Sequence, residues 1–297
     1  MRDVAIIGVA SGLGARDRRC GDGPQALQAS GVLHCVADSE RGAPTFEILH
    51  PLDAGPSWDI LSRVAELDER LASLVLAKFK RHLMPVVVGG DHACAIGTWS
   101  GVRAALAPHE KLGLIWIDAH MDSHVPETSP SGALHGMPLA CLLGAGAKTL
   151  TALAGPFPKL SPEHVCLIGV RSFEAGEKAL LERLGVKVFF MDEVQVRGFD
   201  AVWEEALRHV TRNTVGYGIS IDLDAMDPRD APGVGTPVSA GISGEDLVVA
   251  VRRAHNDPRL LALEIAEYNP HEDKDSLTLK LLRRLICAAA AGEDSDE

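Results

Sequence analysis

Short apolar runs alternate with longer amphipathic stretches along this chain, and this alternation limits the folds that it can adopt. Several of the apolar runs lack polar residues, as expected for strands that are covered on both faces. Three other stretches, 57–82, 199–212 and 244–255, carry apolar residues at helical spacing. We therefore predict an α/β fold: a single domain with a largely parallel β-sheet flanked by helices on both faces. The predicted strands are 4–9, 85–88, 112–118, 165–170, 186–191, 216–222 and 260–265.

The length and composition are those of one large domain. With 297 residues, of which 46% are hydrophobic, the chain can bury a sizeable core, and no linker interrupts it. We predict one folded domain over residues 1–292 and a disordered acidic tail over 293–297. The formal net charge of −12 argues against a nucleic-acid-binding surface and favours a cationic substrate.

Cysteine usage and hydropathy predict a cytoplasmic protein. The six cysteines are scattered without a Cys-x-x-Cys pair, and a strand-like run begins at Val4, where a secretory leader would have its apolar core. No apolar stretch reaches the roughly 20 residues that are needed to cross a bilayer. We therefore expect a reducing compartment and no membrane contact.

Three short segments place Asp and His at the ends of apolar runs. Side chains at i, i+2 and i+4 of extended backbone point to one face, so Asp118, His120 and Asp122 are expected to converge, as are Asp222 and Asp224. An isolated Asp-x-Asp is more often an ordinary acidic turn, but three such turns in one chain favour a two-metal hydrolytic site. The segments are 89–92 (GGDH), 118–122 (DAHMD) and 222–228 (DLDAMDP).

The donor types indicate which ions such a site would hold. Four carboxylates and two imidazoles, without thiolates, suit Mn²⁺ best, with Ni²⁺, Co²⁺ or Fe²⁺ as alternatives. In proteins with parallel sheets, bound molecules and ions lie beyond the carboxyl ends of the strands. Each of the three segments follows a predicted strand. The chemistry and the expected position therefore agree.

These segments resemble those of the arginase (ureohydrolase) family. The similarity covers nearly the whole chain, from 21–24 (GDGP) to 267–270 (EYNP), and 129–138 and 230–237 resemble true arginases more than agmatinases. The resemblance implies an arginase-like three-layer α/β/α fold, a catalytic domain over 1–292 and two Mn²⁺ per subunit. The metal ligands that it implies are His92, Asp118, His120, Asp122, Asp222 and Asp224.

The implied reaction is hydrolysis of the guanidinium group of L-arginine to L-ornithine and urea. Two ions about 3.5–4 Å apart can share one water and lower its pKa to near neutrality, so a metal-bridging hydroxide is the expected nucleophile. Asp122 resembles the family's proton-transfer carboxylate, and His135 resembles its shuttle histidine. Glu267 is expected to anchor the guanidinium by charge-assisted hydrogen bonds.

The residues expected to bind the rest of the substrate depart in part from the arginase pattern. His124 and Ala133 stand where arginases carry Asn, and Glu174 is one methylene longer than the family's Asp. Ser131 is retained, His124 can donate to a carboxylate and Glu174 can accept from an ammonium group. L-Arginine is the predicted substrate, with another guanidino acid such as 4-guanidinobutyrate, or agmatine, as the alternative. The predicted substrate-binding residues are His124, Ser131, Glu174, Thr236 and Glu267.

Thr236 has two interpretations: it positions the surroundings of Glu267, or it belongs to a purely structural Gly-Thr-Pro turn.

Two other classes of protein also fit an Asp/His cluster. A binuclear phosphoesterase is disfavoured by the Glu267 anchor and by the lack of a phosphate-cradling Gly-rich loop. A non-catalytic metal-binding homologue is disfavoured because all six ligand positions are filled. The resemblance further implies a homotrimer or homohexamer with a small cationic guanidino substrate.

Overall fold

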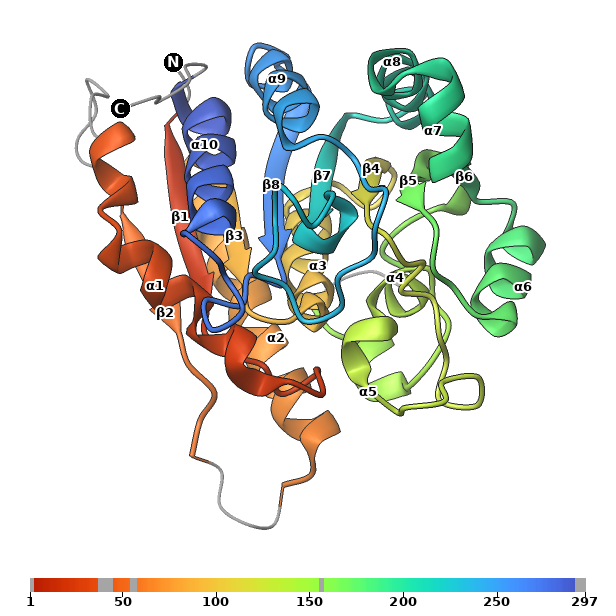
Figure 1. The fold of residues 1–297 in the computed structure, drawn as a ribbon. Coiled ribbons are helices and arrows are strands. Elements are labelled where there is room, and N and C mark those ends of the chain that lie inside the picture. Colours follow the sequence, from red (N-terminus) through yellow and green to blue (C-terminus); the bar gives the residue numbers. More distant parts are fainter. Residues whose placement is uncertain (1–2, 37–44, 54–57, 155–157, 292–297) are drawn as a thin grey trace.

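An eight-stranded, all-parallel sheet forms the centre of the structure, with the strand order β2-β1-β3-β8-β7-β4-β5-β6 (Figure 1). This computed structural model describes residues 3–36, 45–53, 58–154 and 158–291. The predicted α/β fold with a largely parallel sheet is confirmed. The strands are β1 (Val4–Val9), β2 (Phe46–Leu49), β3 (Met84–Gly89), β4 (Leu112–Ile117), β5 (Val165–Val170), β6 (Lys187–Phe190), β7 (Gly216–Asp222) and β8 (Leu260–Ala266).

Helices cover both faces of this sheet, because successive strand residues point to opposite sides. Ile115 and Ile117 belong to a core with α1, α7, α8, α9 and α10, whereas Leu114 and Trp116 pack with α2, α3, α4 and α6. Figure 1 shows α9 and α10 in front of the sheet and α3 behind it. The helices are α1 (Gly23–Ala29), α2 (Ile60–Lys80), α3 (Ala95–Ala105), α4 (Pro138–Leu142), α5 (Lys148–Thr151), α6 (Ala175–Leu184), α7 (Met191–Arg197), α8 (Phe199–Val210), α9 (Gly244–His255) and α10 (Leu277–Ala291).

The structure adds one strand to the seven that were predicted. The edge strand β2 has only four residues, none of them buried, so it lacks the buried apolar run that marks most of the other strands. The helix predicted over 57–82 begins at Ile60, because the carboxylate of Asp59 accepts a hydrogen bond from the Ser62 amide (2.7 Å) and caps it. Residue 57 and the predicted acidic tail 293–297 lie outside the described residues.

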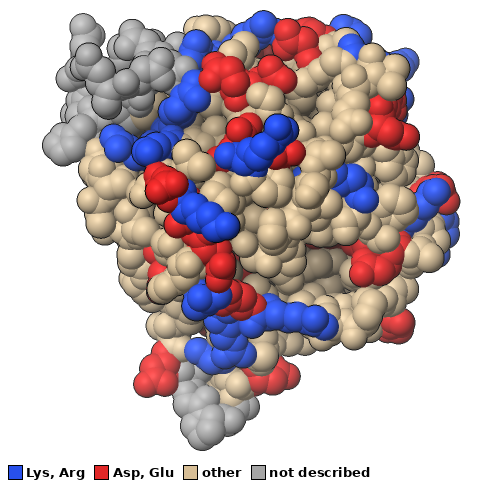
Figure 2. Space-filling model, in the orientation of Figure 1, with Lys and Arg blue, Asp and Glu red and all other residues tan. Residues whose placement is uncertain are grey.

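The distribution of charged side chains and the character of the helices are relevant to the prediction of no membrane contact. On the face shown in Figure 2, Lys and Arg side chains lie beside Asp and Glu side chains. Among the described residues, no helix combines the length and the apolar character that crossing a membrane requires.

The states of the cysteines bear on the predicted reducing compartment. Cys20, Cys94, Cys141 and Cys166 are free and buried, but Cys287 on α10 is disulfide-bonded. The predicted reducing compartment rested on the lack of a Cys-x-x-Cys pair and of a secretory leader, and the disulfide at Cys287 gives it no support.

Candidate active site

The side chains of the candidate site come from the carboxyl ends of four adjacent strands. In the sheet these strands lie in the order β3-β8-β7-β4. Asp118 directly follows β4, Asp222 is the last residue of β7 and Glu267 directly follows β8, while His92 lies three residues beyond β3. Because parallel strands all end at the same edge of the sheet, segments far apart in the sequence meet there.

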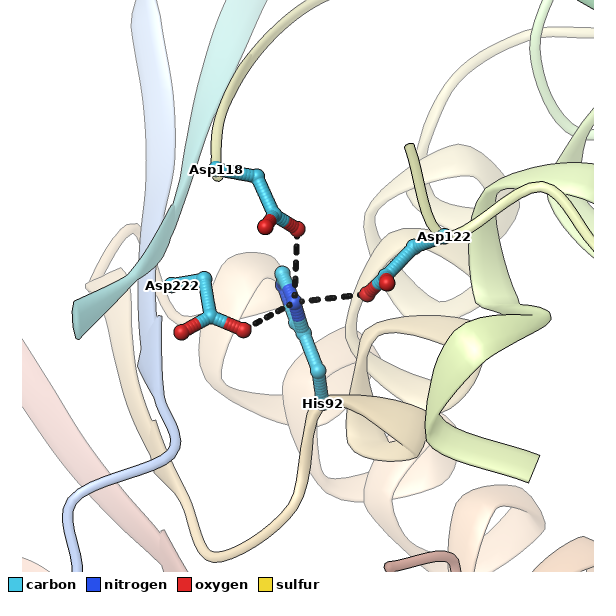
Figure 3. Close-up of side chains that lie close together, drawn as sticks. All are labelled: His92, Asp118, Asp122 and Asp222. Atoms are coloured by element: carbon cyan, nitrogen blue, oxygen red, sulfur yellow. Dashed lines mark ion pairs between the residues drawn. The ribbon is translucent and has the colours of Figure 1, made fainter. Parts of the chain in front are cut away.

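One cluster of carboxylates surrounds Nδ1 of His92 (Figure 3). This nitrogen lies 3.0 Å from Asp122 Oδ2, 3.2 Å from Asp222 Oδ2 and 3.5 Å from Asp118 Oδ2. All four side chains are buried, yet neither His92 Nδ1 nor Asp122 Oδ2 has a hydrogen-bond partner with suitable geometry. Buried polar atoms without partners are costly. The donor set therefore fits a cation held between these atoms.

The other ring nitrogen shows how His92 is oriented toward this cluster. His92 Nε2 lies 3.0 Å from Ser220 Oγ, whose hydroxyl donates to Glu264 Oε2 (3.0 Å). Because the hydroxyl hydrogen is engaged, Nε2–H is the donor to Ser220, and Nδ1 faces the carboxylates. The Trp116 ring stacks on the imidazole at 4.3 Å.

The carboxylates around His92 require positive charge. Burial lowers the pKa of His92, but Asp118, Asp122 and Asp222 outweigh burial and hold it well above its ordinary value. A proton on Nδ1 supplies that charge in the metal-free protein. A divalent ion bound by the deprotonated nitrogen would supply it as well.

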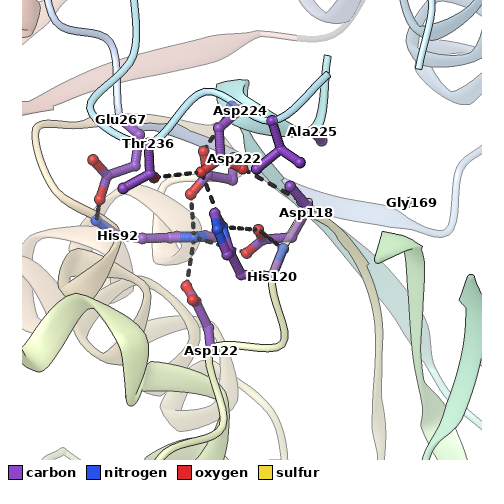
Figure 4. A network of polar contacts seen from close by, with 12 residues as sticks. His92, Asp118, His120, Asp122, Gly169, Asp222, Asp224, Ala225, Thr236 and Glu267 are labelled. Atoms are coloured by element: carbon purple, nitrogen blue, oxygen red, sulfur yellow. Dashed lines mark hydrogen bonds and ion pairs between the residues drawn. The ribbon is translucent and has the colours of Figure 1, made fainter. Parts of the chain in front are cut away.

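A second cluster shares Asp118 with the first (Figure 4). His120 Nδ1 lies 3.1 Å from Asp224 Oδ2 and 3.5 Å from Asp118 Oδ1. The hydroxyl of Thr236 donates to Asp224 Oδ2 (2.9 Å). The two oxygens of Asp118 thus face different clusters, which is the arrangement expected of a carboxylate between two ions.

All six predicted metal ligands are brought together, but extended backbone is not the reason. The strand β4 ends at Ile117, and Asp122 has a left-handed backbone with φ +46°. As a result His120 joins the second cluster and Asp122 the first. Asp224 likewise lies in a 3-10 turn beyond β7. The expectation that both segments converge as extended chain is therefore wrong, because the loops turn immediately after the strands.

Two candidate site residues other than glycine adopt strained backbone. Asp122 has φ +46° and Glu267 has φ +69°. Such conformations cost roughly 1 kcal/mol or more per residue. Surrounding contacts hold them in place: the Glu267 amide donates to Gly90 O (2.8 Å), and the Asp122 carbonyl accepts from the Leu139 amide (3.0 Å).

His135 and Glu267 form a buried pair beside the clusters. His135 Nδ1 lies 2.9 Å from Glu267 Oε1, which also accepts a hydrogen bond from the His92 amide (2.9 Å). Burial lowers the pKa of His135, but Glu267 outweighs burial and raises it to about 10. In the metal-free protein His135 is therefore a cation at neutral pH.

This pair predicts a pH-dependent stability of the metal-free protein. The pKa of His135 is about 10 when folded and 6.5 when unfolded, so its contribution is fully present below pH 6.5 and is lost as the pH rises through 10. The stability difference between wild type and His135→Gln is expected to shrink over this range, by at most about 5 kcal/mol. Denaturant titrations in EDTA measure it; a difference independent of pH would contradict the pairing.

A cavity of about 250 Å³ connects the clusters with four of the five predicted substrate-binding residues, and Glu267 is not among the residues that line it. His124 Nε2 lies 3.1 Å from Glu174 Oε2 and 3.5 Å from Glu177 Oε2. Ser131 is exposed, and its hydroxyl accepts a hydrogen bond from the Ala133 amide (3.1 Å). The residues that line the cavity are Arg16, His120, Asp122, His124, Pro130, Ser131, His135, Gly136, Glu174, Glu177, Asp222, Asp224 and Thr236.

Several residues that support the site were missed in the sequence. Trp116 and Ser220 stand two residues before Asp118 and Asp222, and this strand spacing, which places them on the ligands' face, was the available signal. Glu177 forms a capping box with Glu174 at the start of α6, and the Glu-x-x-Glu spacing was its signal.

Arg171 was also missed, and no local pattern marks it. Its guanidinium donates to the carbonyl oxygens of Asp224 (2.8 Å) and Val238 (2.7 Å), which ties the loop after β7 to a later segment. The hydroxyl of Thr236 donates to Asp224 and so positions a candidate metal ligand, whereas the sequence left open a role beside Glu267 or a purely structural turn.

Metal binding is expected to stabilise the fold. An ion present at about 1,000 times its dissociation constant adds roughly 4 kcal/mol of stability per site. Adding Mn²⁺ to EDTA-treated protein should therefore raise the melting temperature by about 10 °C or more for a domain of this size. Calorimetry with and without the ion measures this shift. An unchanged melting temperature would contradict a metal site built by these clusters.

The all-parallel sheet, with an Asp- and His-lined pocket at its carboxyl edge, defines an α/β enzyme with a candidate metal centre. The family model described as the Arginase family matches residues 2–292. The chain is 40% identical to an arginase of Bacillus caldovelox over 296 residues, covering 96% of this chain and 97% of that arginase. The chain belongs to the arginase family, whose enzymes are amidinohydrolases.

Solved structures agree with this assignment. The structure of arginase from Bacillus subtilis superposes with a TM-score of 0.88 at 36% identity, covering 98% of this chain and 99% of that chain. Arginase of Entamoeba histolytica, solved in complex with L-ornithine, has a TM-score of 0.88 at 28% identity, covering 98% and 100%. The predicted family and enzyme class are confirmed.

Proposed function

We propose that this enzyme hydrolyses L-arginine to L-ornithine and urea with two Mn²⁺ per subunit. The observation that carries the proposal is the pair of clusters that share Asp118, with the buried carboxylate of Glu267 beside them, where it contacts His135 and the His92 amide. Carboxylates and imidazoles are donor types that Mn²⁺ accepts. The L-ornithine in the Entamoeba histolytica arginase structure supports the proposed product.

The two clusters identify the groups that would hold the ions. When bound, the ions would lower the pKa of water toward neutrality and so provide the nucleophile. Asp118 would contribute to both ions. His92, Asp122 and Asp222 would hold one of them, and His120 and Asp224 the other.

The protein's own groups would orient the substrate and move the protons. Glu267 would bind the guanidinium by charge-assisted hydrogen bonds. In the metal-free protein, burial and the charge of Asp118 raise the pKa of Asp122 to about 7. Asp122, which resembles the family's proton-transfer carboxylate, would accept the proton of the nucleophile and pass it on. His135, whose pKa is raised to about 10 by Glu267 in spite of burial, would deliver a proton to the leaving amine.

Urea release by Mn²⁺-loaded protein tests the proposal. L-Arginine, agmatine and 4-guanidinobutyrate would be compared, with EDTA-treated protein as the control and with Ni²⁺ and Co²⁺ as other ions. We expect L-arginine to give the highest kcat/KM. A preference for agmatine or 4-guanidinobutyrate would replace the proposed substrate, and no urea from any compound would reject the proposed chemistry.

Two further properties stay predictions from the sequence: a cytoplasmic location and a homotrimeric or homohexameric assembly. Fractionation of the source cells tests the first. Light scattering of the purified protein tests the second.

A further inference from the structure

An exposed arginine, Arg16, lies where the pocket meets a neighbouring cavity of about 630 Å³. Arg16 and Ser131 line both cavities, so the two spaces adjoin at these side chains. Among the described residues, Arg16 is the only Lys or Arg that lines the pocket, and its guanidinium has no ion-pair partner there. Its charge is therefore free to meet a ligand.

The loop that carries Arg16 is tied to the candidate site two residues earlier. The Gly14 amide donates to Asp91 Oδ2 (3.0 Å), and the Gly14 carbonyl accepts from the His135 amide (3.2 Å). A Cβ on Gly14 would lie 2.5 Å from Asp91 Oδ1, so only glycine permits this approach. The backbone near Arg16 is thus held against the segment that carries His135.

The other candidate donors to a substrate carboxylate are engaged or missing. His124 uses both ring nitrogens, with Nδ1 3.1 Å from Thr128 Oγ1 and Nε2 3.1 Å from Glu174 Oε2. Ala133 has no polar side chain. Ser131 remains as a hydroxyl beside Arg16. In this part of the pocket, Arg16 would therefore supply the positive charge that pairs with the carboxylate of a substrate.

Charges of opposite sign also line the pocket. Glu174 and Glu177 supply carboxylates on the side of His124, whereas Arg16 and Ser131 lie at the junction with the neighbouring cavity. An α-amino acid carries an ammonium and a carboxylate on one carbon, so this separation of charge matches it.

We propose that Arg16 binds the carboxylate of the substrate and thereby selects guanidino compounds that carry a free carboxylate. The inference rests on the proposed function and adds a specificity-determining residue to it. A guanidinium can donate two parallel hydrogen bonds to a carboxylate, which a histidine engaged elsewhere cannot. Ser131 adds a further donor.

Replacing Arg16 by glutamine is expected to raise the KM for L-arginine about 10- to 100-fold, the effect of a hydrogen bond to a charged group. The kcat should change less than about twofold, because the carboxylate is remote from the reacting carbon. Activity on agmatine, which lacks the carboxylate, should stay the same. The selectivity for L-arginine over agmatine then falls by the same factor as the rise in KM.

Arg18→Gln is the matched control. Arg18 lines the neighbouring cavity but is not among the residues that line the pocket, and its replacement removes the same charge. The KM of this variant should match that of wild type. Equal increases in both variants would show a general effect of charge and overturn the inference, as would an unchanged KM in Arg16→Gln.

A binding measurement makes the test independent of turnover. Wild-type Mn²⁺-loaded protein should bind L-ornithine more tightly than putrescine, its decarboxylated counterpart, and Arg16→Gln should lose that difference while Arg16→Lys keeps part of it. Equal loss of affinity for both amines would overturn the role of Arg16. If wild type releases no urea from any guanidino compound, the proposed function fails instead, and the two failures are distinct.

Discussion

Replacing Asp118 by asparagine is expected to abolish urea release and to empty both candidate metal sites. Its Oδ2 lies 3.5 Å from His92 Nδ1 and its Oδ1 lies 3.5 Å from His120 Nδ1, so one substitution removes a charge from both clusters. Without bound ions the nucleophile is not provided, so kcat should fall by about 10³-fold or more, which corresponds to about 4 kcal/mol or more of lost transition-state stabilisation.

Metal content after dialysis separates this result from simple misfolding. The Asp118→Asn protein should retain close to no Mn²⁺, while Asp230→Asn should keep the wild-type content and kcat. Asp230 also follows β7, but it is exposed, and its carboxylate accepts from the Gly244 amide (2.9 Å) outside both clusters. An Asp118→Asn protein with full metal content and normal turnover would contradict the shared role of Asp118.

Replacing Glu267 by glutamine is expected to lower kcat/KM for L-arginine by about 10²-fold, because a charge-assisted hydrogen bond in a buried site is lost. The side chain is 3% exposed, so water cannot replace the carboxylate. Glutamine has the same shape and can still accept from the His92 amide. The metal content should therefore stay at the wild-type value, which distinguishes an anchor for the guanidinium from a metal ligand.

Glu272→Gln is the control for this second substitution. Glu272 is an exposed carboxylate that pairs with Arg19 on the surface (2.6 Å), so its loss should leave kcat/KM unchanged. Loss of bound Mn²⁺ from Glu267→Gln would instead show that Glu267 holds in place the loops that carry the metal ligands. Unchanged kcat/KM would reject the anchor.

The order of apolar runs was enough to predict the fold class. The predicted strands 4–9, 165–170 and 216–222 have the same bounds as β1, β5 and β7, because each is a buried run with a clear end. The edge strand β2 could not be predicted, since its four residues are partly exposed and owe their extended form to pairing with β1. Such pairing is not encoded locally.

The candidate ligands could also be predicted, but their grouping could not. The chemistry of Asp and His at strand ends indicated six donors, and all six lie in the two clusters. Their division depends on the left-handed turn at Asp122 and on the order β3-β8-β7-β4, which brings separate segments side by side. The roles of Ser220 and Arg171 depend on contacts with β8 and with the loop after β7.

The sequence by itself determined the fold class, the family and the types of donor atom, because hydrophobic periodicity and residue chemistry are local properties. Only the tertiary structure decided that Asp118 faces both clusters and that Arg16 reaches the pocket. Those arrangements follow from strand order and from hydrogen bonds between loops distant in the sequence, such as Gly14 with His135. No single segment contains that information, since each loop takes its conformation from the neighbours against which it packs.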